Sequence, residues 1–352
     1  MHNTFEQCFR RTSGPTIATS LGVSLFCGTA ALAQHANVPK IDKLTLGASS
    51  AVGGSYDAYV RLLGRHIGRH IPGSPTAVVQ NVPAGGGMAL ANLIFNTAPK
   101  DGSYFGVLHG TTMQEELYKS SAVRFHARRF AWIGNMMSDV DTCVVSTASG
   151  IKSVDDFFTR EVVMGATGAG AQSYSFPIIY NEILGTKLKV IAGYSGTPDR
   201  ILAMERGELH GACGITTTSY RSVLEQPVKQ GKVIMIAQAG GQKDPEFSEV
   251  PNMLDRAKSA EDRQALSFLF SALDLGRPFA APPETPGEQL ALLRRAFDAA
   301  MVDPEMLDEA SRLKIRIAPS NGEATRQTVG RLLATPHLVV ERIRRILERA
   351  AK

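Results

Sequence analysis

The chain has 352 residues, of which 43% are hydrophobic and 20% charged, with 33 Gly, 18 Pro and 4 Cys. This composition excludes a disulfide-dense miniprotein, a collagen-like repeat and a disordered tail, and the length suggests about two domains. The formal charge of +5, from 38 Lys+Arg and 33 Asp+Glu, raises the question of a nucleic-acid partner.

Residues 1–33 have the pattern of a secretory signal peptide. Arg10 and Arg11 form a basic start, residues 17–32 are apolar or small, and a small-x-small cleavage site makes Gln34 the first residue of the mature chain. A membrane anchor is the alternative, and hydroxyl residues within the apolar run disfavour it. We therefore expect an exported, periplasmic protein with two cysteines and a formal charge of 36 − 32 = +4.

Strands, glycine-rich loops and amphipathic helices alternate along the first two thirds of the mature chain. The first unit is a strand at 43–47, a loop at 48–54 and a helix at 55–71 that ends at a Pro-Gly breaker. Three further units repeat this order, with strands at 76–81, 161–167 and from 189, loops at 83–87, 168–172 and 193–197, and helices at 88–96, 173–184 and from 198. A strand at 104–108 follows the helix at 88–96. The alternation predicts an α/β fold with a mostly parallel sheet.

Helices dominate the last third of the chain. After a strand at 232–238 the spacing of apolar residues predicts helices at 259–273, 287–301, 304–313, 322–333 and 339–350, with a strand at 314–318. No low-complexity linker separates two contiguous halves. Two-domain α/β chains without a linker often cross between their domains on paired strands.

Three of the glycine-rich loops open helices. Such loops present unpaired backbone N–H groups and the positive end of the helix dipole, so they can hold an anion such as a carboxylate. Ligands of open sheets gather at the carboxyl ends of the strands, where these loops would lie. The alternative is that each glycine serves only a structural turn.

Motifs of enzymes are incomplete in this sequence. The segment at 168–173 lacks the third glycine of a dinucleotide fingerprint, and 193–196 is one residue short of a nucleophile elbow that would use Ser195. We therefore expect no enzyme and no cofactor. His66 and His70 have the spacing of a metal pair on a helix, but Arg65 and Arg69 flank them, which favours a solvated helix face and no metal site.

Nucleic acid is also disfavoured as a partner. Basic residues share their helices with acids, as in 341–349, and aromatic residues make up only 7% of the chain. Mixed charge of this kind is typical of a solvated helix face.

The two cysteines of the mature chain, Cys143 and Cys213, lie in apolar, strand-like segments that could be neighbours. In an oxidising compartment they could form a disulfide. They could equally be buried free thiols that act as small hydrophobic residues.

Several motifs together resemble the solute receptors of tripartite tricarboxylate transporters, the Bug family of periplasmic binding proteins. In chain order they are GGSYDAY (53–59), VQNVPAGG (79–86), APKDG (98–102), GATGAG (165–170), GYSG (193–196), MERGE (204–208) and VP (250–251). Each motif is short, but their order and spacing cover nearly the whole mature chain.

This resemblance implies a Venus-flytrap fold of the type II kind, in which two α/β lobes joined by crossing strands close on a ligand. By analogy the first lobe is 38–143 plus 239–352, and the second lobe is 144–238. The resemblance also implies that backbone N–H groups of two glycine loops hold one carboxylate of the ligand. Carried over by position, the residues are Val52, Gly53, Gly54, Ser55 and Tyr56 in one lobe, and Ala166, Thr167, Gly168, Ala169 and Gly170 in the other.

The sequence departs from the family where members commonly carry acids before the cleft, because His210 and Gly214 stand there. No Asp that would meet the amino group of an amino-acid ligand is evident at that position, which favours a carboxylate without an ammonium. We expect His109, Thr216 and Thr217 to contact the far end of the ligand. The alternatives are a structural histidine and hydroxyls that cap a helix.

The leading hypothesis is a receptor that captures a small dicarboxylate, tricarboxylate or aromatic carboxylate and delivers it to membrane transporter subunits. Lobe closure would be its mechanism, and we expect a monomer. The alternative is a periplasmic subunit that reports ligand occupancy to a membrane sensor kinase.

Overall fold

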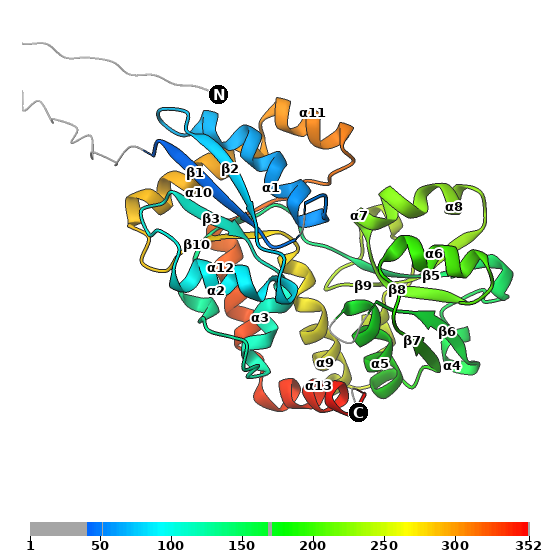
Figure 1. Ribbon diagram of the computed structural model, residues 1–352. Helices are drawn as coiled ribbons and strands as arrows, with labels where there is room; N and C mark the ends of the chain where they lie inside the picture. Colours follow the sequence, from blue (N-terminus) through cyan, green and yellow to red (C-terminus); the bar gives the residue numbers. More distant parts are fainter. Residues whose placement is uncertain (1–40, 51, 168–170, 351–352) are drawn as a thin grey trace, which may run out of the picture. The chain divides into compact units, whose positions relative to one another are not determined.

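A computed structural model describes residues 41–50, 52–167 and 171–350. The predicted signal peptide at 1–33 lies outside these residues. Two sheets organise the described chain (Figure 1). None of the helices in the described ranges is both long and apolar enough to cross a membrane.

The first sheet has six strands in the order β11-β4-β10-β3-β1-β2. β1 is parallel to β2 and β3, with Leu46 opposite Val79, while β10 is antiparallel to β3 and β4. Its strands are β1 (Lys43–Ala48), β2 (Thr76–Asn81), β3 (Tyr104–Val107), β4 (Ala131–Asn135), β10 (Pro278–Ala281) and β11 (Ser320–Asn321).

Helices cover both faces of the first sheet. Buried side chains of α1, α10 and α11 form the core on one face, and those of α2, α3 and α12 form the core on the other. These helices are α1 (Ser55–His66), α2 (Met88–Asn96), α3 (Gly110–Leu117), α10 (Gly287–Met301), α11 (Pro304–Arg312) and α12 (Gly322–Leu333). Apolar residues at helical spacing, such as Val60 and Leu63 of α1, are fully buried against the sheet.

The second sheet has five strands in the order β7-β6-β8-β5-β9. β6 is parallel to β7 and β8, and β5 runs antiparallel between β8 and β9, with Asp141 opposite Thr216 and Ala239. The strands are β5 (Asp141–Ser146), β6 (Val162–Gly165), β7 (Leu188–Ile191), β8 (Gly211–Thr216) and β9 (Val233–Ala239). The chain passes from the first sheet to the second through residues 136–140, here named the connecting segment, and returns after β9.

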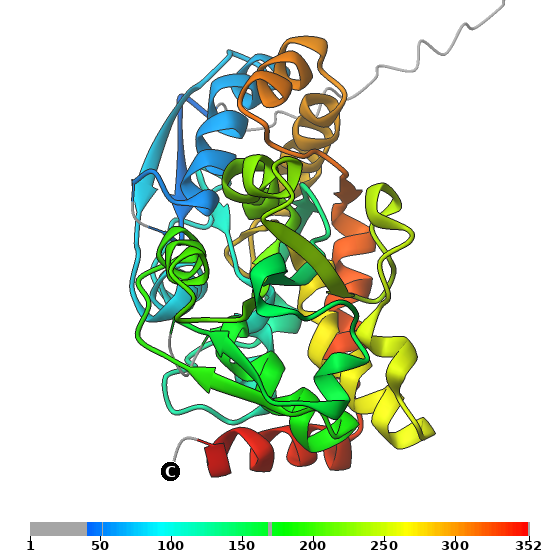
Figure 2. The same ribbon diagram turned by 90° about the vertical axis from the view of Figure 1, so that its right-hand side faces the viewer.

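Helices from two distant parts of the chain cover the second sheet. α5 packs on one face together with α9 and α13, which lie near each other in yellow and red in Figures 1 and 2, and α6 packs on the other face. The helices near the second sheet, including three short ones, are α4 (Asp156–Thr159), α5 (Gln172–Leu184), α6 (Thr197–Glu205), α7 (Thr217–Ser219), α8 (Glu225–Lys229), α9 (Ala260–Ser271) and α13 (His337–Ala350). The lobe boundaries at 143/144 and 238/239 stay a prediction. The helices α9 and α13 belong to the predicted first lobe by sequence, but they pack against α5, which covers the second sheet.

Short turns of tighter or wider helix complete the chain. They are Ile67–His70, Gly85–Gly87, Ala127–Arg129, Thr147–Ser149, Tyr220–Leu224, Pro245–Phe247, Met253–Arg256 and Leu273–Leu275. The helix predicted at 55–71 is therefore α1 followed by one such turn. The helix predicted to stop at 184 does so, because Gly185 takes the left-handed conformation with φ 82° that closes α5.

The strand predicted at 314–318 is wrong. In this part of the chain Ser320 and Asn321 pair with β4, while the residues before them are irregular. Ala318 donates one hydrogen bond to the Met136 carbonyl, and the Arg316 carbonyl accepts from the Tyr59 hydroxyl instead of from a strand. Ile315 and Ile317 both pack on the core. The alternation of apolar residues at 314–318 therefore reflects burial of these two side chains, and not pairing with a neighbouring strand.

Candidate functional site

The first glycine loop joins β1 to α1 and is closed by a buried carboxylate. Gly53 takes a left-handed conformation, with φ 81°, and its N–H donates to Asp57 Oδ2 at 2.9 Å. Burial alone would raise the pKa of Asp57, but hydrogen bonds from Arg61, Asn81 and Gly53 outweigh it and hold that pKa below its ordinary value. The Gly53 amide is thus committed to the protein, and the amides of Ser55 and Tyr56 open α1, where N–H groups have no carbonyl one turn earlier within the helix.

Tyr56 and His109, which are both predicted ligand contacts, lie together. Their rings stack with centroids 3.8 Å apart and planes 6° apart, and His109 precedes the first residue of α3. Burial and the nearby Arg277 lower the pKa of His109 to about 3, so the imidazole is neutral at neutral pH. Its Nε2 atom is buried and has no hydrogen-bond partner among the residues that the structure describes.

Arg277 is a site residue that the sequence predictions missed. Its side chain is buried at the start of β10, and its guanidinium carbon lies 4.2 Å from the centre of the Tyr56 ring. One terminal nitrogen donates to Ser55 Oγ at 3.3 Å, and the other donates to the Gly276 carbonyl and lies 3.6 Å from Asp139 Oδ2. A cation therefore stands directly behind the start of α1. The only signal in the sequence was a single Arg that precedes an apolar strand.

The second glycine loop of the predicted ligand site, which follows Gly165, joins β6 to α5. The Ala166 N–H donates to the Ile191 carbonyl at 2.8 Å, and the Thr167 N–H donates to Ser173 Oγ at 3.1 Å. These two amides, predicted to face a ligand, are thus used within the protein. Three further predicted residues, Gly168, Ala169 and Gly170, lie outside the described residues.

Thr216, the last residue of β8, and Thr217, the next residue, have structural partners. Thr216 Oγ1 accepts from the Ser219 N–H at 3.3 Å and so caps α7, as the capping alternative expected. Thr217 is fully buried; its N–H donates to the Val140 carbonyl at 3.1 Å, and its hydroxyl donates to Asp139 Oδ1 at 3.4 Å. Thr217 therefore ties the second sheet to the connecting segment, and a ligand contact by either threonine stays a prediction.

Two buried acids, Asp139 of the connecting segment and Asp141 of β5, were also not predicted from the sequence. Asp139 contacts Arg277 and Thr217, whereas neither oxygen of Asp141 has a hydrogen-bond partner among the described residues. Burial and the neighbouring Asp139 raise the pKa of Asp141 to about 8. Asp141 is therefore mostly protonated below that pH, because an unpaired buried charge is costly.

Cys143 of β5 and Cys213 of β8 form a disulfide in the structure, with Cα atoms 4.0 Å apart. Both residues are buried in the core beneath α5. The Cys213 carbonyl accepts a 2.8 Å hydrogen bond from Arg200 of α6. The disulfide thus links the strand by which the chain enters the second sheet to the strand that ends beside α5.

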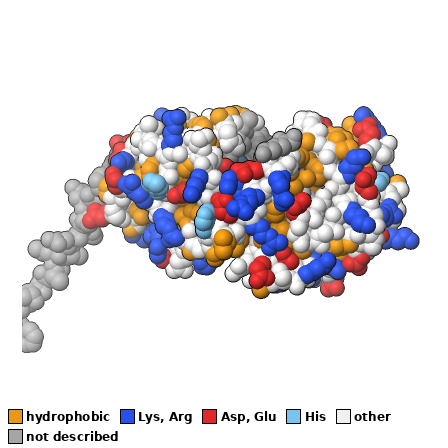
Figure 3. Space-filling model, turned by 90° about the horizontal axis from the view of Figure 1, so that it is seen from below, with side chains coloured by type: hydrophobic (Ala, Val, Ile, Leu, Met, Phe, Trp, Pro, Cys, Tyr) orange, Lys and Arg blue, Asp and Glu red, His pale blue; other side chains and the backbone are white. Residues whose placement is uncertain are grey.

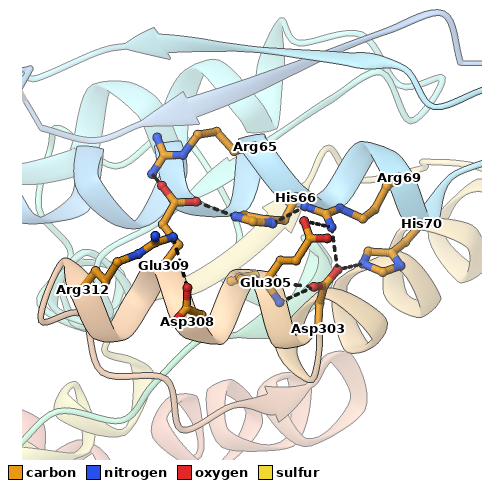
Figure 4. A network of polar contacts seen from close by, with 10 residues as sticks. Arg65, His66, Arg69, His70, Asp303, Glu305, Asp308, Glu309 and Arg312 are labelled. Atoms are coloured by element: carbon orange, nitrogen blue, oxygen red, sulfur yellow. Dashed lines mark hydrogen bonds and ion pairs between the residues drawn. The ribbon is translucent and has the colours of Figure 1, made fainter.

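The histidine pair of α1 belongs to an ionic network with α11 (Figure 4). His66 Nε2 lies 2.6 Å from Glu309 Oε2, and His70 Nε2 lies 2.9 Å from Asp303 Oδ2. His66 is buried, so the expectation of a solvated face is wrong for it. Sequence could not show this, because the acids lie more than 230 positions away. Within the described ranges, no group of three or more His, Cys, Asp or Glu could hold a metal ion.

Acids accompany the basic residues of α13. Arg344 contacts Glu341 and Glu348, Arg342 contacts Asp262, and the apolar side of the helix is buried. Viewed from the side where α13 lies in Figure 1, Lys and Arg side chains intermingle with Asp and Glu (Figure 3). This is the mixed charge that the sequence indicated for 341–349.

Comparisons with known proteins identify the fold. Neither a protein-family model nor a curated protein matches the sequence. A TctC solute binding protein from Polaromonas matches with a TM-score of 0.65 and 17% identity, over 87% of this chain and 98% of that chain. The chain has the fold of a solute-binding protein.

Two further solved structures agree with this fold. A protein of R. palustris, solved with adipate, has a TM-score of 0.62 and 14% identity over 87% of this chain and 97% of its own. The periplasmic binding protein BugD has a TM-score of 0.61 and 19% identity over 88% of this chain and 97% of its own. The predicted two-lobe α/β fold is therefore confirmed.

Proposed function

We propose that this protein is a periplasmic receptor that captures a small carboxylate and delivers it to a membrane transporter of the tripartite tricarboxylate type. One carboxylate of the ligand is held at the start of α1, and closure of the two lobes retains it. The pattern of an export signal at 1–33 and the periplasmic BugD among its structural neighbours support the location.

The observation that carries this proposal is the group of donors at the start of α1. The amides of Ser55 and Tyr56 open the helix, where its dipole is positive, and the guanidinium of Arg277 lies behind them with a hydrogen bond to Ser55. Neutral His109 stacks on Tyr56 and offers a buried ring nitrogen. The adipate in the R. palustris structure is a carboxylate on the same fold, which further supports this ligand class.

Ser195 is the serine of the incomplete nucleophile elbow in the sequence, and the structure gives it a partner. Ser195, the residue that a hydrolase would need, donates its hydroxyl to Asp199 in the first turn of α6. The contact joins two residues four positions apart where the chain enters α6.

A negative charge introduced at the start of α1 tests the carboxylate site. Ser55→Asp places a carboxylate beside Arg277 and the α1 dipole, so it occupies the proposed ligand position while it favours the helix. Gly287→Asp is the matched control, because it adds the same charge at the exposed start of α10. The measurement is thermal shift against citrate, succinate, malate and benzoate, followed by calorimetry on the best binder.

We expect at least one of these acids to stabilise the native protein and Gly287→Asp alike, and Ser55→Asp to lose about tenfold or more in affinity. If Ser55→Asp binds as tightly as the native protein, the carboxylate does not lie at α1. If none of the acids binds, the assignment as a carboxylate receptor is wrong.

A further inference from the structure

A groove of about 460 Å³ lies between α1 and β2, which is the edge strand of the first sheet (Figure 1). Arg61 and Arg65 of α1 and Arg69 of the turn after it line this groove, and no Asp or Glu is among the described residues that do so. The lining does not include Ser55 or Tyr56, so the groove is separate from the proposed carboxylate site. It therefore presents three positive charges at a second place on the molecule.

The three arginines are spread along the length of β2, because α1 and the turn after it run antiparallel to that strand. Arg61 donates to Asn81 Oδ1 at 3.2 Å, at the end of β2, whereas a Cβ at Gly68 would lie 2.4 Å from the carbonyl oxygen of Pro75, just before its start. Four residues advance a helix by about 6 Å, and two residues advance a strand by about 6.6 Å. Side chains at alternate positions of a strand added beside β2 would therefore match the spacing of the arginines.

β2 has a free edge at this groove. Among the residues that the structure describes, β1 is its one partner strand. The Val82 N–H donates to the Ala48 carbonyl of β1, and backbone groups point to alternate sides along a strand, so the amides of Ala77 and Val79 point away from β1. Edge strands are usually protected by charged residues or Pro, but Thr76–Asn81 contains neither. Such an edge is a template for a further strand.

The acids that pair with the arginines lie outside the groove and leave them accessible. Arg65 bonds to Glu309 at 2.7 Å and Arg69 bonds to Glu305 at 2.6 Å, both acids of α11 (Figure 4). The two arginine side chains are nevertheless 46% and 37% exposed. A guanidinium has five N–H donors, and ion pairs this exposed hold their partners weakly, so each arginine can take a second carboxylate.

We propose that this groove and the free edge of β2 bind an acidic, extended segment of the membrane partner. The segment adds to β2 as a strand and directs carboxylates at alternate positions toward the arginines. That a membrane transporter supplies the segment rests on the proposed function. Loops of membrane proteins on the outer side of the membrane carry fewer Lys and Arg than cytoplasmic loops, which suits a contact made by acids.

Three synthetic peptides of about ten residues test the strand and its spacing by calorimetry at low ionic strength, where exposed charges are least screened. In the first, Asp or Glu alternates with Val or Thr. The second has the same composition with its acids consecutive. The third is the first peptide with a methyl group on every backbone nitrogen, which removes the N–H donors that a strand needs.

Two double variants test the arginines. Arg65→Gln with Arg69→Gln removes two charges of the groove. Arg345→Gln with Arg349→Gln is the matched control, because these two arginines of α13 are also four positions apart and are 73% and 67% exposed. Thermal melts check that both variants are folded, and calorimetry with the carboxylate that the native protein binds checks the site at the start of α1.

We expect the native protein to bind the alternating peptide at least about tenfold more tightly than either other peptide. The groove variant should lose about fivefold or more of this affinity, and the control variant less than about twofold. Equal binding of the three peptides, or equal losses in the two variants, would overturn the inference. It would also fall if the native protein forms a dimer that prevents peptide binding, because a second copy would then occupy the edge.

The carboxylate measurement separates this inference from the proposed function. Both double variants should bind the carboxylate like the native protein, because their residues lie outside that site. Loss of peptide binding with intact carboxylate binding would overturn the docking groove alone. Binding of the alternating peptide without binding of any carboxylate would overturn the receptor assignment and leave the groove as a site for acidic strands.

Discussion

The contact between β8 and the start of α5 makes Gly214 a position where a single methyl group should do severe harm. Gly214 has φ 68°, and a Cβ there would lie 2.4 Å from the Ser173 nitrogen. Ordinary contact begins at 3.4 Å, so the first turn of α5 must move by about 1 Å. That turn follows the second glycine loop directly, so its displacement should also disturb ligand binding.

Gly207 supplies the matched control for this experiment. Its φ is 76°, but no atom lies within 4 Å of the position that a Cβ would take. Alanine at either position costs about 1–2 kcal/mol for the left-handed backbone. Only Gly214→Ala adds overpacking, which typically costs about 1–3 kcal/mol. We expect losses in unfolding free energy of about 2–5 kcal/mol for Gly214→Ala and about 1–2 kcal/mol for Gly207→Ala.

Urea unfolding followed by circular dichroism measures both losses, and calorimetry with the best-binding carboxylate measures the effect on the site. We expect Gly214→Ala to bind about tenfold more weakly and Gly207→Ala to bind like the native protein. Equal losses of stability in the two variants would refute the steric reasoning, because backbone strain alone would then explain both.

Three further predictions concern the buried polar groups and the disulfide. Replacing Cys143 and Cys213 together by Ala opens a loop with a sequence separation of 70 and should lower the unfolding free energy by about 4 kcal/mol; urea midpoints that match those of the oxidised native protein would contradict this. Arg277→Met leaves Asp139 buried without its cation and should lower the free energy of unfolding by about 3–5 kcal/mol, and adding Asp139→Asn should restore part of this loss. A double-mutant cycle with zero coupling energy would show that the 3.6 Å contact does not contribute to stability. The pKa of Asp141 is raised in the folded protein, so the free energy of unfolding of the native protein falls as pH rises from about 4 to about 8. The free energy of unfolding of Asp141→Asn should therefore rise relative to that of the native protein by up to about 4 kcal/mol between about pH 5 and pH 8. Parallel pH profiles of stability for the two proteins would refute this.

Several elements of the fold could be predicted from local sequence. The strands β1, β2, β3 and β9 and the helices α1, α2, α5 and α10 lie close to their predicted bounds, because glycine loops, breakers and helical spacing of apolar residues are local signals. β4 and β10 were not predicted. Both are short apolar runs without alternation, which can be strand or helix depending on what covers them.

The candidate site divides in the same way. Glycine-rich helix starts indicated an anion site, and the pair of Tyr56 and His109 was anticipated as two separate contacts. The amides of Gly53, Ala166 and Thr167 were expected to face a ligand, but the structure gives them acceptors in Asp57, Ile191 and Ser173. Asp57 lies within the first motif, but the Ile191 carbonyl and the Ser173 hydroxyl lie outside the motif at 165–170, so that motif alone could not show that the amides of Ala166 and Thr167 have acceptors.

By itself the sequence determined the alternation of strands and helices, the positions of the helix starts and the mixed charge of the helices, because each follows from residues within about one or two turns of one another. The tertiary structure decided that β10 inserts between β3 and β4, that α9 and α13 pack with α5, and that Arg277 stands behind Ser55. Those outcomes depend on the burial of surfaces from residues as far as 222 positions apart, for which a single sequence carries no local signal.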